Sequence, residues 1–458
     1  MLGLIPLARA TFDVPFAEEN LAGMLALLDR LGVQTAGPRT LLMDGAATDA
    51  AVADLKAAGV QDILVLQVTF TDAAAIARIG AEFDGALAIW APPEPRLGGR
   101  LRLNAFCGMN LAAHALGLRE RPFSWAYANP VAPETEQEIK DLLAGHRLAK
   151  PPALAAPAAP SLKAEAIVQS LGTRRIGRIG EHPEGFDTCA YDPATLTGLT
   201  GVKVEAMPLD ALFENARSQT PENARSLRQQ ADTFLTGLEE VNQSELDRSL
   251  RLKLALDDIK STGKYDAFAL RCWPETFTEY GGAVCGPASM LGEARTPCAC
   301  EADVYGAVSQ LLLQDVAQAP VFLVDLVDMD VSDDTGVVWH CGQAPISMAA
   351  RKPSATIHTN RKMPLLFEFP LKEGRVTLAR ISQARGRQQM VIGGGEMLAR
   401  PMAFTGTSGT LRFDAPAADV TAKVIGAGLE HHMAIAYGDH RETLREVAGA
   451  LKLDITEL

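Results

Sequence analysis

Carboxylates that could do acid or base chemistry stand at the ends of predicted elements in the second half of the chain. Glu275 directly follows the apolar strand predicted over 266–274, at the edge where open α/β sheets bind their ligands. Glu301 and Asp303 begin a helix predicted over 301–316, where a carboxylate can also serve only as a helix cap. These three side chains are therefore candidates for a site, with a structural role as the alternative for each.

Imidazoles accompany these carboxylates further along the chain. His340 lies inside a short apolar strand, and the adjacent His431 and His432 begin another. Because neighbouring residues on a strand face opposite sides, we expect only one of the adjacent pair to face a given site. Two carboxylates with one or two imidazoles suit a divalent cation such as Mn²⁺. Each histidine could instead be a buried residue with an ordinary hydrogen-bond partner.

Other motifs with a known chemistry are absent or weak. No G-x-G-x-x-G sequence follows the first predicted strand, so a dinucleotide site is not indicated. The run 393–395 is Gly-Gly-Gly without a following Lys-Ser or Lys-Thr pair, which is typical of a turn. Cys298 and Cys300 form a C-x-C and lack the paired C-x-x-C spacing of structural zinc. We expect these thiols to be small buried side chains.

The elements that must position these residues fall into three predicted domains. Residues 1–158 alternate apolar strands with amphipathic helices, which indicates a parallel sheet covered on both faces. The Pro/Ala tract at 150–160 predicts a semi-rigid linker. Residues 159–294, which carry Glu275, repeat the α/β pattern, and residues 295–458 change to short strands divided by Gly and Asp. We predict an α/β protein with two Rossmann-like domains and a β-rich, barrel-like C-terminal domain.

Composition restricts the partners and the compartment. Lys and Arg number 43 against 56 Asp and Glu, a net charge of −13 that disfavours nucleic acid as a partner. No apolar run approaches the roughly 18 residues of a membrane span, and residues 1–12 lack the pattern of a signal peptide. The seven cysteines are an odd number scattered over a long chain, which indicates reduced thiols. We expect a cytoplasmic protein without membrane or nucleic-acid partners.

Several segments of the sequence resemble the L-fucose/L-arabinose isomerase superfamily, especially its L-fucose isomerase-like members. The similarity touches all three predicted domains and keeps the order of the family's motifs. The segments are RCWPETF (271–277), CEADVYGAV (300–308), WHCGQAP (339–345), GLEHHMAIAYGDH (428–440), LARATFDVPFAEEN (7–20), LQVTFTDA (66–73) and the run 93–116.

The resemblance implies an enzyme that interconverts aldoses and ketoses with Mn²⁺. Carried over motif by motif, the metal ligands are Glu275, Asp303 and His432, and the two carboxylates are also the catalytic base and acid of a cis-enediolate mechanism. Arabinose isomerases add an upstream histidine, for which His340 is the nearest candidate. The family arginine after the first strand corresponds to Arg9 and reaches a neighbouring subunit's site. This implies a homo-oligomer, either a hexamer or another trimer-based assembly.

The substrate is expected to be a monosaccharide. A neutral sugar such as L-fucose, D-arabinose or L-arabinose is the main expectation. Sulfoquinovose, converted to sulfofructose, is the alternative, because several arginines fall in segments predicted to edge the cleft and arginine binds anionic groups well. A non-catalytic sugar-binding or sensor protein is the second alternative, and it would need no paired bases around a metal. The expected substrate contacts are Arg9, Thr69, Arg96, His182, His340 and Trp273.

Overall fold

The first part of the chain forms a parallel sheet of five strands in the order β2-β1-β3-β4-β5 in the computed structural model, which describes residues 1–458. Strand β4 is buried along its whole length, as expected of a sheet covered on both faces. The strands are β1 (Leu2–Leu7), β2 (Thr35–Ala36), β3 (Asp62–Gln67), β4 (Leu87–Ala91) and β5 (Ser124–Tyr127), and the helices are α1 (Val14–Arg30), α2 (Gly45–Ala57), α3 (Ala74–Glu82), α4 (Ala105–Leu118) and α5 (Thr135–Leu143).

A second parallel sheet, in the order β7-β6-β8-β9, follows the Pro/Ala tract. Strand β9 lies just beyond the predicted boundary at 294/295 and pairs with β8; the domain boundaries stay predictions. The strands are β6 (Arg175–Ile179), β7 (Lys203–Met207), β8 (Ala267–Leu270) and β9 (Cys298–Ala299), and the α-helices are α6 (Leu162–Leu171), α7 (Pro193–Thr200), α8 (Leu209–Ser218), α9 (Pro221–Phe234), α10 (Gln243–Gly263), α11 (Cys285–Glu293) and α12 (Val304–Ala317).

The last part of the chain is a mixed sheet of nine strands in the order β12-β13-β16-β11-β10-β17-β14-β15-β18. An additional pairing of β15 with β16 closes its middle strands into a barrel, which confirms the barrel-like C-terminal domain. The strands are β10 (Phe322–Asp330), β11 (Thr335–His340), β12 (Ser354–Thr356), β13 (Leu366–Pro370), β14 (Gly374–Ser382), β15 (Gln389–Leu398), β16 (Thr407–Phe413), β17 (His432–Tyr437) and β18 (Ile455–Glu457), with helices α13 (Ala417–Ala427) and α14 (Arg441–Leu451).

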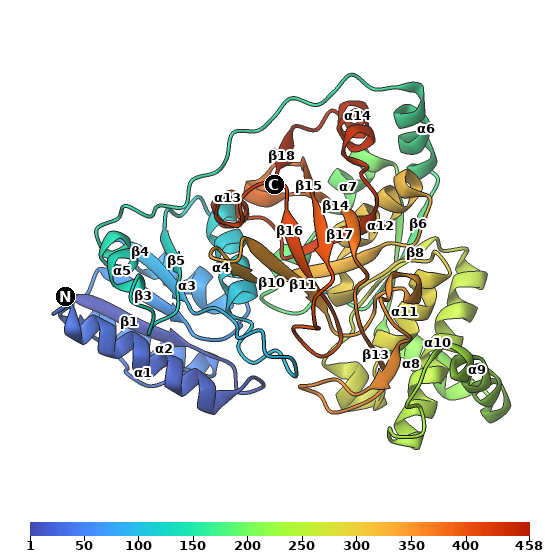
Figure 1. Ribbon diagram of the computed structural model, residues 1–458, viewed down its shortest axis with the longest axis horizontal. Coiled ribbons are helices and arrows are strands. Elements are labelled where there is room, and N and C mark those ends of the chain that lie inside the picture. The colour runs from blue at the N-terminus through green and yellow to red at the C-terminus, as the bar shows by residue number, and fades with distance from the viewer.

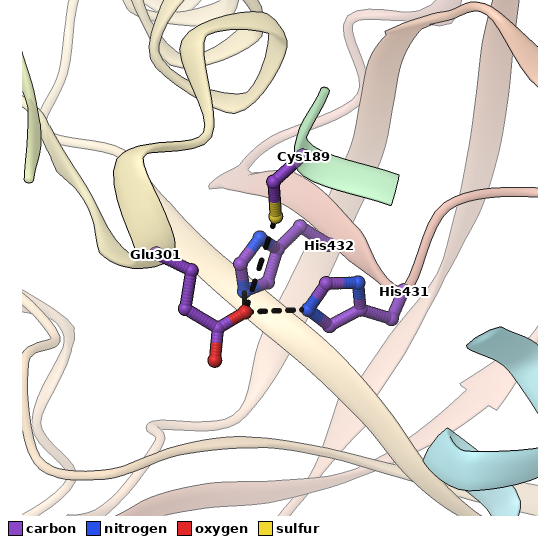
Figure 2. Close-up of side chains that lie close together, drawn as sticks. All are labelled: Cys189, Glu301, His431 and His432. Carbon is purple, nitrogen blue, oxygen red and sulfur yellow. Dashed lines mark hydrogen bonds and ion pairs between the residues drawn. The ribbon is translucent and has the colours of Figure 1, made fainter. Parts of the chain in front are cut away.

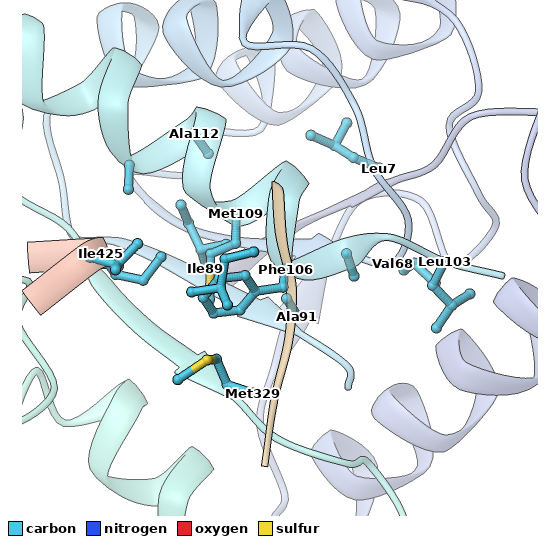
Figure 3. Close-up of a cluster of buried hydrophobic side chains, with 14 of the residues drawn as sticks. Leu7, Val68, Ile89, Ala91, Leu103, Phe106, Met109, Ala112, Met329 and Ile425 are labelled. Atoms are coloured by element: carbon cyan, nitrogen blue, oxygen red, sulfur yellow. The ribbon is translucent and has the colours of Figure 1, made fainter. Parts of the chain in front are cut away.

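Helix α4 joins the first sheet to the barrel through a shared hydrophobic core. Figure 3 shows Phe106 and Met109 of α4 beside Ile89 of β4, with Met329 of β10 and Ile425 of α13 in the same cluster. This cluster comprises 72 buried residues, most of them from the first sheet with its helices and from the barrel. Burial of that much apolar surface is the main stabilising contribution to folding, and it fixes the first sheet against the barrel.

The Pro/Ala tract is extended, as predicted, but it is bound to the C-terminal domain along its length. Figure 1 shows it passing from the first sheet over the barrel to α6. The backbone groups of Ala155 and Ile455 exchange hydrogen bonds of 2.8 and 2.9 Å, and the N–H of Ala158 donates to the carbonyl of Arg445 at 3.2 Å. The tract is therefore not a free spacer between domains, and residues 150–160 are called the strap below.

No helix of the protein combines the length and the apolar character that crossing a membrane requires.

Replacing Gly449 tests whether the strap is held by close backbone approach. A Cβ atom at this position of α14 would lie 2.0 Å from the carbonyl oxygen of Ala158. We expect Gly449→Ala to lower the free energy of unfolding by about 1–3 kcal/mol through this overlap, seen as a lower melting temperature in calorimetry. Gly198→Ala is the control, because a Cβ there in α7 meets no atom within 4 Å. Equal melting temperatures for the two variants would contradict this packing.

Candidate active site

A cleft opens where the two parallel sheets and the barrel meet, and ligand sites of enzymes commonly lie between domains in this way. Residues from all three parts of the chain line it, so that no single part contains the site. Among them are Arg9, Phe70, Trp273, Glu301, Asp325, His340, Arg361 and His431.

Glu301 reaches the cleft because the chain bends before α12 begins. The helix predicted from residue 301 starts at Val304, and Asp303 caps it by accepting a hydrogen bond of 2.8 Å from the N–H of Gly306. Glu301 itself has φ of 59°, in the left-handed region. Such a conformation is uncommon for a residue with a side chain and often marks a functional position.

Two hydrogen-bonding groups hold the Glu301 carboxylate. Nε1 of Trp273 donates to Oε1 at 3.0 Å, and Nε2 of His431 lies 2.9 Å from Oε2. Burial raises the pKa of Glu301, but the interactions with His431, His432 and Trp273 outweigh it and hold the pKa below the usual value. The carboxylate is therefore ionised at neutral pH and available as a ligand or base.

Asp325 stands opposite His432 through the register of β10 with β17. Strand β10 runs from Phe322 to Asp330, and the Asp325 side chain interrupts its apolar sequence. Oδ1 of Asp325 is buried without a hydrogen-bond partner and lies 3.4 Å from Nε2 of His432. A buried carboxylate oxygen without a hydrogen-bond partner is energetically costly, so Oδ1 of Asp325 is a candidate ligand for a cation.

The Asp303 carboxylate orients His432 from the side away from the cleft. Nδ1 of His432 lies 2.9 Å from Oδ2 of Asp303, and the Arg380 guanidinium donates to both oxygens of Asp303 at 2.8 and 3.1 Å. Burial raises the pKa of Asp303, but Arg380 and His432 hold it far below the usual value. Burial and the nearby His431 lower the pKa of His432. His432 is thus a neutral imidazole with its Nε2 lone pair facing the cluster.

Both members of the histidine pair face this cluster, so the expectation that only one could do so is wrong. Their rings lie 3.9 Å apart, and Figure 2 shows both beside Glu301. Strand β17 begins at His432, and His431 precedes it. Strand alternation therefore does not apply to His431.

The arrangement fits a divalent cation. One ligand atom each of Asp325, His340 and His432 lies within 4.8 Å of the other two, and Oδ1 of Asp325, Nε2 of His340 and Nε2 of His432 are buried without a hydrogen-bond partner. Oε2 of Glu301 is 3.8 Å from Nε2 of His432. Carboxylate and imidazole donors suit Mn²⁺ and related ions. Cys189 also borders the group, but burial raises the pKa of its thiol well above the usual value, which disfavours the thiolate that metals bind.

Of the three predicted metal ligands, Asp303 and His432 lie together in the structure. Glu275 lies elsewhere, in an ion pair of 2.6 Å with Arg271, beside a surface groove. Arg9 lines the cleft of its own chain, and its N–H donates to the hydroxyl of Thr69 at 2.8 Å.

Three predicted contacts do not line the cleft. Thr69 is buried, Arg96 is bound to Asp328 at 2.5 Å, and His182 is half-buried with its carbonyl accepting from Arg271 at 3.3 Å. Most of the arginines in segments predicted to edge the cleft are paired with acids, and these are Arg9, Arg96, Arg102, Arg174, Arg175 and Arg178.

The sequence marks Glu301 as a candidate carboxylate, but the family resemblance assigns the ligand and acid–base roles to Glu275 and Asp303. Asp325 and Arg361 were not among the predicted site residues. The signal for Asp325 was available, because an ionisable residue inside a buried strand needs a partner. Arg361 lies in an irregular loop, where no periodic pattern marks a site residue.

Two family models match the chain. The family described as fucose/sulfoquinovose isomerase, N-terminal domain, matches residues 3–150, and the family L-fucose isomerase, C-terminal domain, matches residues 338–458.

Curated relatives match the chain from end to end. A sulfoquinovose isomerase of Clostridium sp. (strain MSTE9) is 30% identical over 98% of this chain and 97% of its own length. Proteins of the same name from Alkalicoccus urumqiensis and Priestia megaterium are 28% and 27% identical, over 99% and 98% of this chain and 98% and 97% of their own lengths. The chain therefore belongs to the fucose/sulfoquinovose isomerase family and is an aldose–ketose isomerase.

Proposed function

We propose that this isomerase converts sulfoquinovose to sulfofructose. The observation that carries the proposal is the convergence of Glu301, Asp325 and His432 at one end of a cleft, in a chain whose curated relatives are named sulfoquinovose isomerases. The main expectation from the sequence, a neutral sugar such as L-fucose, becomes the alternative substrate.

Glu301, Asp325 and His432 are the proposed ligands of a divalent cation, with Mn²⁺ as the first candidate. His340 adds a further imidazole at the same point. Asp303 orients His432, in the manner of carboxylates that position metal-binding histidines. When bound, the cation would supply Lewis-acid stabilisation of the negative charge that develops on the O1 and O2 atoms of the sugar.

Glu301 and Asp325 are the proposed acid and base. Isomerisation removes a proton from C2 of the open-chain aldose and delivers a proton to C1, and both carboxylates lie at the cleft wall. The indole N–H of Trp273 keeps Glu301 in place, which favours proton transfer because the reacting atoms are held in position. Glu275 with Asp303, the pair expected from sequence motifs, is the competing assignment.

The proposal includes the cellular setting. All seven cysteines are free thiols in the structure, which supports a reducing compartment such as the cytoplasm. A homo-oligomer, hexameric or otherwise trimer-based, stays a prediction. In the structure Arg9 lines the cleft of its own chain, and its reach into a neighbouring subunit's site stays a prediction.

Metal affinity separates the two assignments of the glutamate. We expect Glu301→Gln to weaken Mn²⁺ binding by about 100-fold or more, because it removes a charged ligand, as measured by isothermal titration calorimetry on metal-free protein. Glu275→Gln is the matched control and should bind Mn²⁺ within about twofold of the wild type, because its carboxylate pairs with Arg271. The opposite pattern would favour Glu275 as the ligand.

Substrate identity is tested by NMR on the purified, Mn²⁺-loaded protein. We expect conversion of sulfoquinovose to sulfofructose, with kcat/KM at least tenfold above that for L-fucose, D-arabinose or L-arabinose. Removal of the cation with a chelator should abolish turnover, and added Mn²⁺ should restore it. Turnover of a neutral sugar alone would contradict the sulfoquinovose proposal, and turnover of none would support the sensor alternative.

A further inference from the structure

The cleft has a cationic end as well as the cluster of carboxylates and histidines. Arg9 follows β1 and Arg361 lies in the loop between β12 and β13, so the two guanidinium groups come from distant parts of the chain. Both lie against the indole of Trp273, with their central carbons 5.8 and 5.6 Å from its ring. Guanidinium groups on the face of an indole are favourably placed by cation–π interaction.

The two arginines differ in how their charge is balanced. Arg9 forms an ion pair of 2.7 Å with Asp72. The Arg361 side chain is half-buried and has no carboxylate partner. Burial and the charge of Arg9 lower the pKa of Arg361. An arginine nevertheless remains protonated in proteins. An unneutralised cation beside another cation inside a cleft is unfavourable. An anion bound between them would remove this penalty.

The loop that carries Arg361 is held in a defined shape. Nδ1 of His358 accepts hydrogen bonds from the N–H groups of Asn360 and Arg361 at 3.2 and 3.3 Å. Arg100 donates to the side chain of Asn360 at 3.3 Å and to the carbonyl of Thr11 at 3.1 Å, which ties the loop to the first domain. The position of Arg361 is therefore prepared before a ligand binds, as efficient recognition requires.

Trp273 relates the cationic end to the catalytic end. Its Nε1 donates to Glu301 at 3.0 Å, while its ring lies against the guanidinium groups of Arg9 and Arg361. The indole of Trp273 thus lies between the Glu301 carboxylate, which would act at C1 and C2, and the two guanidinium groups. A ligand lying along this indole would have its reacting carbons at one end and an anionic group at the other.

We propose that Arg361, assisted by Arg9, binds the sulfonate on C6 of the substrate and sets the preference for a sulfonated over a neutral hexose. The inference rests on the proposed function, because it assumes sulfoquinovose as the substrate. A sulfonate is a permanent anion with three acceptor oxygens, to which a guanidinium group can donate two hydrogen bonds. The two arginines enter from different domains, so the sulfonate would also hold the cleft together.

The test compares Arg361→Met with the wild type on sulfoquinovose and on D-glucose, its neutral counterpart. We expect kcat/KM for sulfoquinovose to fall about 10- to 100-fold, as for the loss of charge-assisted hydrogen bonds. The fall for D-glucose should be smaller, so that the preference for sulfoquinovose over D-glucose decreases by about tenfold or more. Arg361→Lys should restore part of the loss, and Arg351→Met, at an exposed position outside the cleft, should behave as the wild type.

A binding measurement keeps the inference independent of turnover. The probe is 6-deoxy-6-sulfo-D-glucitol, which has no carbonyl group to isomerise, with D-glucitol as the neutral reference, both titrated into the Mn²⁺-loaded protein. We expect the wild type to bind the sulfonated probe at least tenfold more tightly than glucitol, and Arg361→Met to lose this difference.

The outcomes distinguish the two proposals. Sulfoquinovose turnover that Arg361→Met leaves unchanged would overturn the role of Arg361 and leave the proposed function intact. Equal binding of the two probes by the wild type would also overturn that role. Tight binding of the sulfonated probe that depends on Arg361, without turnover of sulfoquinovose, would support the anion site and contradict the proposed function.

Discussion

A buried series of hydrogen-bonded groups behind the cleft, from Arg380 through Asp303 to His432, holds the imidazole around which the catalytic end is built. All three side chains are at most 1% exposed. Removing either member of the Arg380–Asp303 ion pair would leave an uncompensated buried charge, which costs about 3–5 kcal/mol. Because Asp303 engages Nδ1 of His432, the Nε2 atom must face Asp325 and the cleft.

The register of the barrel strands and the bend before α12 place two carboxylates beside the His432 imidazole. Asp325 is the cross-strand neighbour of His432, and the left-handed backbone at Glu301 places a second carboxylate beside it. The cationic end needs residues from two domains, Arg9 from the first and Arg361 from the C-terminal domain. The core shared by α4 and the barrel and the bound strap therefore matter to the chemistry, because they fix the distance between the two ends.

The periodicity of the chain predicts most of this architecture, including both parallel sheets and the barrel-like domain. Motifs also pointed to Asp303 and His432, which lie together in the structure, although we propose that Asp303 orients His432 and is not itself a ligand. Glu301 was a candidate that could equally have been a helix cap, because the bend that separates it from α12 leaves no mark in the sequence pattern. Strand alternation gave the wrong expectation for His431 because β17 begins one residue later, at His432. Glu275 follows its strand as predicted, but Arg271, four residues earlier, forms an ion pair with it. Sequence patterns locate elements well and local bends poorly.

The central claim is that the cluster at the catalytic end holds a divalent cation. Anomalous diffraction at the manganese edge, on crystals of the protein grown with Mn²⁺, tests it most directly. The account predicts one strong peak bounded by Glu301, Asp325 and His432, with Asp303 outside the coordination shell. A peak beside Glu275, or coordination by Asp303 in place of Asp325, would contradict it.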